Sequence, residues 1–264
     1  MATIEDNKRA WDGTYDWKTR GDEWSAAWGG PSMQWYGSIL PRIRSHVPTR
    51  RILEIACGYG RWTQYLKDLC ESLVVVDLSV ECIRACEERF AGSSNVEYHV
   101  NDGKSLDMIR NASVDFVFSG DSLVHANESV MEAYVRQLER LLKDDGVAFI
   151  HHSNLGEYRA RYSRVREIPK LEGLLARLGI LNLHWRDFGV NARKVETWAE
   201  ANGLRCISQE LVPWGTRGLF IDCFSTIVKS GSSRARENRV LRNGSFMQEA
   251  QNLLRLSRLY TDQA

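Results

Sequence analysis

The chain has 264 residues, of which 43% are hydrophobic and 26% charged, and its formal net charge is +1. This length allows one sizeable domain with insertions, and the near-neutral charge lacks the basic face of a nucleic-acid binder. No apolar run is long enough to span a bilayer, and the opening MATIEDNKRAWDG lacks the apolar core of a signal peptide. Six scattered cysteines favour buried thiols in a cytoplasmic protein over disulfides or a zinc site.

Short β-branched runs alternate with helical patterns along the middle of the chain. This alternation predicts a parallel sheet covered by helices. The predicted strands are 51–56, 72–78, 96–101, 114–120, 146–152, 204–212 and 219–229. The predicted helices are 61–70, 80–90, 128–145 (which a normal stop at Gly146 follows), 191–203 and one around 246–260.

Three segments lie outside this repeat. Residues 1–50 carry five tryptophans and are expected to form a lid or substrate segment. Residues 155–190 form a long insertion within the central domain, 51–230, and we expect it to be partly helical and to help form a pocket. Residues 231–264 read as a polar, arginine-rich linker followed by a helix.

The stretch ILEIACGYGRWTQYL places a glycine-rich turn between a strand and a helix, where nucleotide-like ligands bind. Its third position is Thr63 rather than the glycine of a dinucleotide site, and no Gly-Lys-Ser/Thr follows to cradle phosphate. Glu54 would repel a pyrophosphate but suits an amino group. Asp77 ends the second strand and suits ribose hydroxyls, and Asp102 ends the third and suits an adenine amine. A ligand with an amino acid, a ribose and an adenine but no phosphate is S-adenosylmethionine.

On these residues the chain resembles the class I S-adenosylmethionine-dependent methyltransferases, from about Arg51 to Lys229. The resemblance implies a seven-stranded, Rossmann-like sheet with helices on both faces and a helical lid. Alanine stands at residue 56, where the family often has glycine. The motifs and the resemblance together predict a set of cofactor-binding residues: Glu54, Ala56, Gly58, Gly60, Thr63, Asp77, Leu78, Asp102, Gly103, Ser119 and Trp28. The alternative is a Rossmann-like sheet that binds phosphate or no ligand at all.

The end of the fourth strand, SGDSLVHAN, lacks the Asn/Asp-Pro-Pro-aromatic and Pro-Cys motifs of enzymes that methylate nucleic-acid bases. Histidines stand there instead, with His125 after the fourth strand and His151 and His152 at the end of the fifth. A hydroxyl acceptor needs a base, and histidine suits that role near neutral pH. Neighbours on a strand face opposite sides, so one of the adjacent pair points away from the pocket. Which histidine is the base stays open.

Other candidate residues have more than one interpretation. Asp121 is compatible with three roles. It orients a histidine, it caps a turn, or it binds a divalent cation such as magnesium together with a histidine and Asn154. The tryptophans fit either lid packing or stacking on a sugar. The candidate acceptor-binding residues are Trp185, Trp214, Asn154 and Tyr158.

The motifs WGGPSMQWYGSILPRI, EIACGYGRWTQYL, DSLVH and FIHHSN together resemble a subgroup of actinobacterial sugar O-methyltransferases. That subgroup includes the 1-O-methyltransferase of mycobacterial methylmannose polysaccharide synthesis, and it implies a hydroxyl of a sugar or oligosaccharide precursor as acceptor. The alternatives are an O- or N-methyltransferase acting on a natural product or lipid, and a non-catalytic cofactor-binding subunit. A homodimer is compatible with the sequence.

Overall fold

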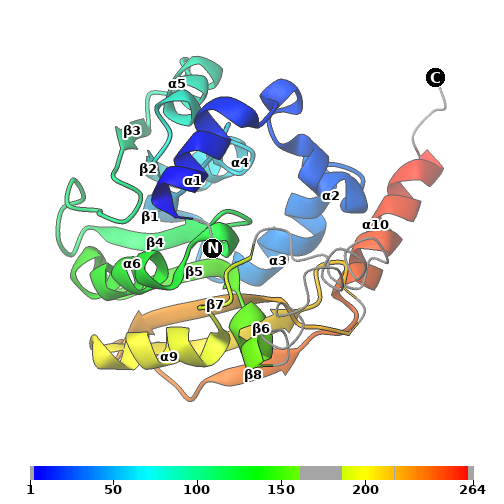
Figure 1. Cartoon of the computed structure of the whole chain (residues 1–264). Coiled ribbons are helices and arrows are strands. Elements are labelled where there is room, and N and C mark those ends of the chain that lie inside the picture. The colour runs from blue at the N-terminus through cyan, green and yellow to red at the C-terminus, as the bar shows by residue number, and fades with distance from the viewer. Residues whose placement is uncertain (1–2, 161–185, 217, 261–264) are drawn as a thin grey trace.

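The computed structural model describes residues 3–160, 186–216 and 218–260. These residues contain one mixed sheet with the strand order β3-β2-β1-β4-β5-β7-β6-β8 (Figure 1). The strands are β1 Thr49–Ile55, β2 Cys70–Asp77, β3 Val96–Val100, β4 Val114–Ser119, β5 Leu142–Ser153, β6 Leu204–Val212, β7 Asp222–Lys229 and β8 Arg239–Arg242. This is the predicted Rossmann-like class, with an eighth strand added at one edge.

The middle of the sheet is parallel and buried on both faces. In β1, Ile52 and Leu53 are fully buried, and Leu53 pairs with Val74 of β2 on one side and with Val117 of β4 on the other. Strands covered on both faces read as continuous apolar runs, which is why the sequence revealed them. The sheet then turns antiparallel, because β7 pairs in that sense with both β5 and β6.

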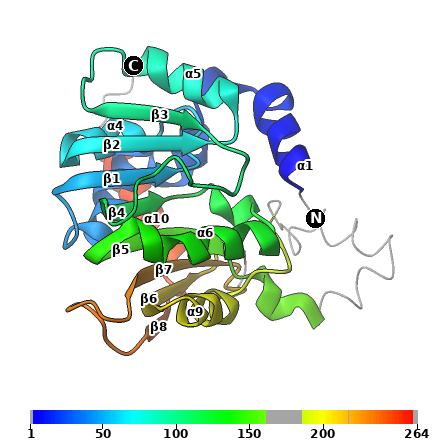
Figure 2. The ribbon, with the colours of Figure 1, turned by 90° about the vertical axis from the view of Figure 1, so that its left-hand side faces the viewer.

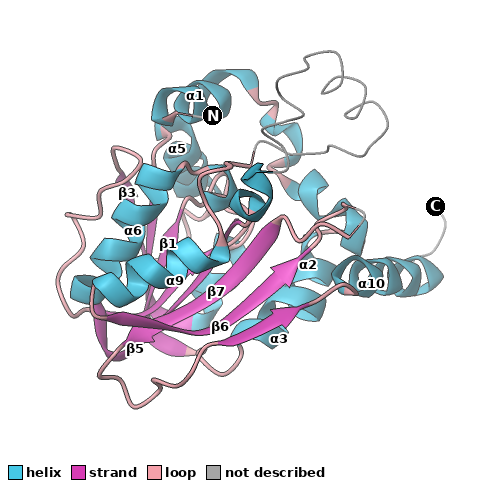
Figure 3. Ribbon diagram, turned by 60° about the horizontal axis from the view of Figure 1, so that its bottom comes forward, coloured by secondary structure: helices cyan, strands magenta, loops and turns pink. Residues whose placement is uncertain are grey.

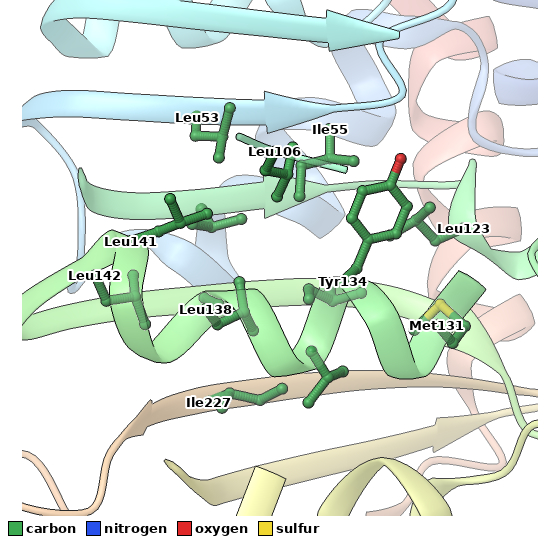
Figure 4. Packing of buried hydrophobic residues seen from close by; sticks show 14 of the residues in the cluster. Leu53, Ile55, Leu106, Leu123, Met131, Tyr134, Leu138, Leu141, Leu142 and Ile227 are labelled. Carbon is green, nitrogen blue, oxygen red and sulfur yellow. The ribbon is translucent and has the colours of Figure 1, made fainter. Parts of the chain in front are cut away.

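Helices cover both faces. They are α1 Ile4–Arg9, α2 Pro31–Gln34, α3 Leu40–Ile43, α4 Thr63–Leu66, α5 Val80–Arg89, α6 Glu128–Leu141, α9 Ala192–Ala201 and α10 Phe246–Tyr260. One face packs against α6 and α9, which lie together across the strands in Figure 3. Figure 4 shows Leu138 and Leu141 of α6 in the same buried cluster as Leu53 and Ile55 of β1. The other face packs against the N-terminal helices, α4, α5 and α10.

Several element boundaries differ from the prediction. The helix predicted over 128–145 ends at Leu141, because Leu142 is extended (φ −68°, ψ 140°) and pairs with Val114 of β4. The helix predicted over 61–70 is split into α4 and a 3₁₀ turn at Lys67–Leu69, since β2 already begins at Cys70. The last predicted strand, 219–229, begins only at Asp222.

The polar stretch after residue 231 is more than a linker. Its residues Arg239–Arg242 form β8, which lies parallel to β6 and pairs Arg239 with Ser208. All four residues of β8 are exposed, so no alternation of apolar and polar residues marks this edge strand in the sequence.

The N-terminal segment and the C-terminal helix pack against each other, and Figure 1 shows α10 beside α2. A Cβ at Gly37 would lie 2.5 Å from Leu253 Cδ1, so any larger residue there would force the Leu253 side chain to move. Phe246, at the start of α10, is fully buried with its ring 5.7 Å from that of Trp28. This contact holds the ends of the chain to the same face of the sheet.

Candidate active site

The glycine-rich turn after β1 takes a left-handed backbone at three places. The φ angles are 61° at Ala56, 55° at Gly58 and 80° at Gly60. A Cβ at Gly60 would stand 2.5 Å from Phe90 Cε2, so this position requires glycine for space as well as for conformation. Ala56 adopts a backbone that favours glycine, which explains why glycine is common there in the resembling family.

Asp77, at the end of β2, fastens this turn. Its Oδ2 accepts a hydrogen bond from the Gly58 amide at 3.0 Å, and its Oδ1 accepts one from the Ser79 amide at 2.9 Å. The side chain is buried, and that burial raises the pKa of the carboxyl group although the two amides oppose the shift. Asp77 therefore joins the two loops that border the cavity described next.

The glycine-turn cavity, whose empty space of about 880 Å³ includes its opening to solvent, lies at the carboxyl ends of the parallel strands, the usual ligand edge of such a sheet. Seven of the predicted site residues line it: Ala56, Gly58, Asp77, Leu78, Gly103, Asp121 and His125. Its apolar lining includes Leu123, Ala126, Val130 and Tyr134, and the Tyr134 hydroxyl accepts a hydrogen bond from Asn101 Nδ2 at 3.0 Å. Leu123 and Ala126 come from the short turn after β4, whereas Val130 and Tyr134 come from α6, which no sequence motif linked to the site.

The N-terminal segment forms the opposite wall. Figure 2 shows α1 beyond the arrowhead of β2, and a Cβ at Gly103 would lie 3.0 Å from Ile4 Cγ2. Trp17 stacks on Tyr59 of the glycine turn, with ring centroids 4.2 Å apart and an interplanar angle of 13°. The density of tryptophans was the only sequence signal for this wall.

A second space, the tryptophan cavity, adjoins the first and has a volume of about 1030 Å³. It is lined by Ala10, Trp11, Thr14, Tyr15, Trp24, Asp121, His125, Arg186 and Trp214. Trp11, Trp24, Asp121 and His125 line both cavities, so these four residues mark the junction between them.

Arg186 is held in place by a buried carboxylate. Its Nε and Nη2 donate to Asp222 at 2.9 and 2.7 Å, a two-pronged pairing. Burial opposes ionisation of Asp222, yet the Arg186 guanidinium holds the pKa of that carboxyl well below its usual range. Asp222, which does not line the tryptophan cavity, therefore balances the charge of Arg186, which does.

The three candidate histidines occupy different surroundings. His125 lines both cavities, and its ring lies 5.6 Å from that of Trp11. His151 is buried outside both linings, where Nδ1 accepts from the Asp121 amide at 3.1 Å and Nε2 lies 3.4 Å from Asp222 Oδ2. His152 is also buried outside them, and its ring nitrogens lie 2.8 Å from Ser153 O and from Ser225 Oγ. Burial lowers the pKa of His152 to about 4.

Glu54 and Thr63 lie behind the glycine turn, outside the cavity lining. The Thr63 hydroxyl donates to Glu54 Oε2 at 2.6 Å. Burial raises the pKa of Glu54 to about 8. Asp102 is exposed and caps its own turn, since Oδ1 accepts from the Lys104 and Ser105 amides.

The remaining candidates also serve the fold outside the two linings. The Ser119 hydroxyl donates to Ile55 O, and Trp28 packs on Trp214. Asn154 donates to Phe220 O and accepts from the Ala192 amide, and the Tyr158 hydroxyl accepts from the Phe220 amide. Trp185 lies outside the described residues.

Within the ranges that the structure describes, no group of three or more His, Cys, Asp or Glu side chains is arranged to hold a metal ion. Asn154, one of the three ligands considered for magnesium, has both ends of its amide committed to backbone groups. No helix among the described residues is long and apolar enough to cross a membrane.

Comparison with known proteins gives a consistent class. Residues 52–146 match the family model described as a methyltransferase domain. Phosphoethanolamine N-methyltransferase 1 of Caenorhabditis elegans is 26% identical over 102 residues, which are 39% of this chain and 21% of that protein. Nodulation protein S of Azorhizobium caulinodans is 30% identical over 96 residues, which are 36% of this chain and 45% of that protein. The match thus spans less than half of either relative.

Among solved structures, the DhpI-SAM-HEP complex has a TM-score of 0.54 at 19% identity, covering 86% of this chain and 97% of that one. The PH0226 protein of Pyrococcus horikoshii has a TM-score of 0.52 at 21% identity, covering 74% and 92%. At these identities the structures establish a shared fold.

The strand order, the glycine turn and the family model that matches residues 52–146 are all similar to those of one class, the class I S-adenosylmethionine-dependent methyltransferases. S-adenosylmethionine is the cofactor of that class, and the glycine-turn cavity suits it. Asp77, the residue predicted to bind the ribose hydroxyls, lines this cavity together with Leu78, Gly103 and Tyr134.

Proposed function

We propose that this protein transfers a methyl group from S-adenosylmethionine to a hydroxyl of a sugar or oligosaccharide precursor, with His125 as general base. The observation that carries the proposal is the junction of the two cavities at Trp11, Trp24, Asp121 and His125. A methyl donor bound in the glycine-turn cavity and a methyl acceptor bound in the tryptophan cavity would meet at these four side chains.

The lining of the tryptophan cavity supports a carbohydrate acceptor. Trp11, Trp24 and Trp214 supply aromatic faces for the C–H surfaces of a sugar ring, and Asp121 and Arg186 supply polar groups for its hydroxyls. The charge of Arg186 is balanced by Asp222 and that of Asp121 by Arg61. Among the described residues, the cavity therefore favours an uncharged, polyhydroxylated molecule over an ionic one.

His125 suits the chemistry better than the other two histidines. The bound sulfonium supplies an activated methyl group, but a neutral hydroxyl is a weak nucleophile and needs a base to take its proton. His125 lies at the junction of the cavities, whereas His151 and His152 are buried outside both. We assign residues 1–50 the role of a lid, because Trp11 and Trp24 of that segment wall both cavities.

An amine acceptor is the second candidate, favoured by the relative named phosphoethanolamine N-methyltransferase. A neutral amine is nucleophilic without a base, so the two candidates differ in their need for His125.

The test is methyl transfer from labelled S-adenosylmethionine to a panel of mono- and oligosaccharides and small amines. His125→Gln keeps a polar side chain of similar size but cannot take a proton. We expect it to lower turnover on a sugar by roughly a hundredfold to ten-thousandfold, the usual contribution of a positioned base.

The matched control is His99→Gln on β3, because His99 pairs with Glu97 and lines neither cavity. Transfer to amines alone, with His125→Gln fully active, would replace the sugar proposal with the amine one. Cofactor binding without transfer to any acceptor of the panel would favour a non-catalytic subunit.

A further inference from the structure

Arg61 follows the last glycine of the turn, yet its side chain reaches two other parts of the molecule. Its Nη2 donates to Asp121 Oδ2 at 2.6 Å, and its Nη1 donates to Ser25 Oγ at 3.0 Å. The guanidinium carbon lies 4.4 Å from the ring centroid of Trp62 and 5.3 Å from that of Trp24. One side chain thus connects the glycine turn, the N-terminal segment and the end of β4.

The surroundings hold this guanidinium firmly. Arg61 is only 4% exposed, and a charge so well buried needs a partner of opposite sign and further hydrogen bonds. Asp121 supplies the charge, the two indole faces add cation–π attraction, and the fully buried Ser25 and Gln34 add polar contacts. Because Trp24 and Ser25 belong to the N-terminal segment, the position of Arg61 depends on that segment being closed.

Asp121 is constrained from two sides. Its backbone is left-handed (φ 65°), a sparsely populated conformation for a residue other than glycine, and its amide donates to His151 Nδ1. Its Oδ2 is bonded to Arg61. Its Oδ1 lies 4.0 Å from His151 Nδ1 and has no hydrogen-bond partner among the described residues, while the side chain lines both cavities.

We infer that Arg61 is a positioning residue: it orients Asp121 so that Oδ1 accepts a hydrogen bond from the methyl acceptor, and it does so only when Trp24 and Ser25 close over it. The acceptor site is therefore completed by closure of the N-terminal segment. The role of Asp121 toward the acceptor rests on the proposed function, whereas the coupling between segment and strand can be tested without an acceptor.

The kinetic test compares Arg61→Met with Arg61→Lys, at saturating cofactor, on an acceptor found in the panel. A misplaced acceptor contact costs on the order of a hundredfold, so kcat/KM for the acceptor should fall by about that factor in Arg61→Met. Arg61→Lys keeps the charge but not the paired N–H groups, and it should recover only part of the loss.

Arg89→Met is the matched control. Arg89 also supports the glycine turn, through Tyr59 O at 2.8 Å and Gln64 Oε1 at 2.9 Å, but no hydrogen bond joins it to Asp121. At saturating cofactor, Arg89→Met should lower kcat/KM for the acceptor far less than Arg61→Met does. Equal losses in Arg61→Met and Arg89→Met would show that Arg61 merely supports the turn.

A double variant tests whether the two residues act as one unit. Arg61→Met/Asp121→Asn should be no slower than Asp121→Asn alone, because residues that share one function are not additive. Losses that multiply would overturn the inference.

Hydrogen exchange tests the coupling with S-adenosylhomocysteine bound and no acceptor present. In Arg61→Met, peptides covering residues 20–28 and 119–125 should both exchange faster than in wild type and in Arg89→Met. Faster exchange confined to residues 58–66 would refute the coupling. This result stands whether or not any sugar is methylated, so a failed proposed function and a failed coupling give different outcomes.

Discussion

Replacing Asp77 with asparagine tests the assignment of the glycine-turn cavity most directly. The carboxylate accepts from the amides of Gly58 and Ser79, one on each oxygen. A carboxamide has only one acceptor oxygen, so its NH₂ group must face one of these two amides. A buried donor left without an acceptor costs about 1–3 kcal/mol.

The same change weakens cofactor binding in two ways. The turn that borders the cavity loses one of its tethers, and the ribose hydroxyl that we predict to bind Asp77 loses a charged acceptor. At 1.4 kcal/mol per factor of ten, a cost of 1–3 kcal/mol predicts roughly a fivefold to 150-fold weaker affinity for S-adenosylhomocysteine. Titration calorimetry measures this affinity, and a thermal scan verifies that the variant is folded at the temperature of the titration.

Asp102→Asn is the matched control. Asp102 also follows a strand and also accepts from two amides, those of Lys104 and Ser105, but it is exposed and lies outside the cavity lining. We expect it to bind the cofactor with nearly wild-type affinity. The reasoning is refuted if Asp77→Asn binds normally, or if Asp102→Asn weakens binding as much.

Two further predictions concern the glycine turn. In a urea titration, Gly60→Ala should lower the free energy of unfolding by about 1–3 kcal/mol through overpacking against Phe90. The left-handed backbone at this position adds a cost of about 1–2 kcal/mol. Gly92→Ala is the control: its Cβ would meet nothing within 4 Å, so its free energy of unfolding should not change. Burial raises the pKa of Glu54 in the folded protein to about 8, above the ordinary value of 4.5, so its contribution to stability is full below about pH 4.5 and is lost as the pH rises toward 8. Wild type should therefore lose stability relative to Glu54→Gln between pH 5 and 8, and a constant difference would show that Glu54 does not hold its proton there.

The clearest predictions were the strands with a stretch buried on both faces. In β1, β2 and β4 this stretch is rich in Ile, Leu, Val or Phe, so local sequence specifies it. β8 could not be predicted, because an exposed edge strand of four residues is held by its pairing with β6 and not by its own composition. The end of α6 was missed because pairing of Leu142 with β4 overrides the helical pattern.

The candidate site shows the same contrast between residues that local sequence predicts and residues that long-range packing brings in. The turn residues and Asp77 are close in sequence to the strands that carry them, and the structure places them on one cavity. Trp11, Trp17 and Tyr134 reach that cavity through long-range packing, which motif spacing does not encode. The stretch FIHHSN could not separate His151 from His152 by function, since both are buried in contacts within the sheet.

The packing of α10 reaches further into the molecule than a terminal helix usually does. The Phe246 ring lies 5.5 Å from that of Trp214, and Trp214 in turn forms a wall of the tryptophan cavity. Removing α10 would therefore loosen an indole of the acceptor site that we propose. A fusion partner that disturbs this helix is expected to impair acceptor handling, which makes the C-terminal end the less suitable place for an immobilisation tether.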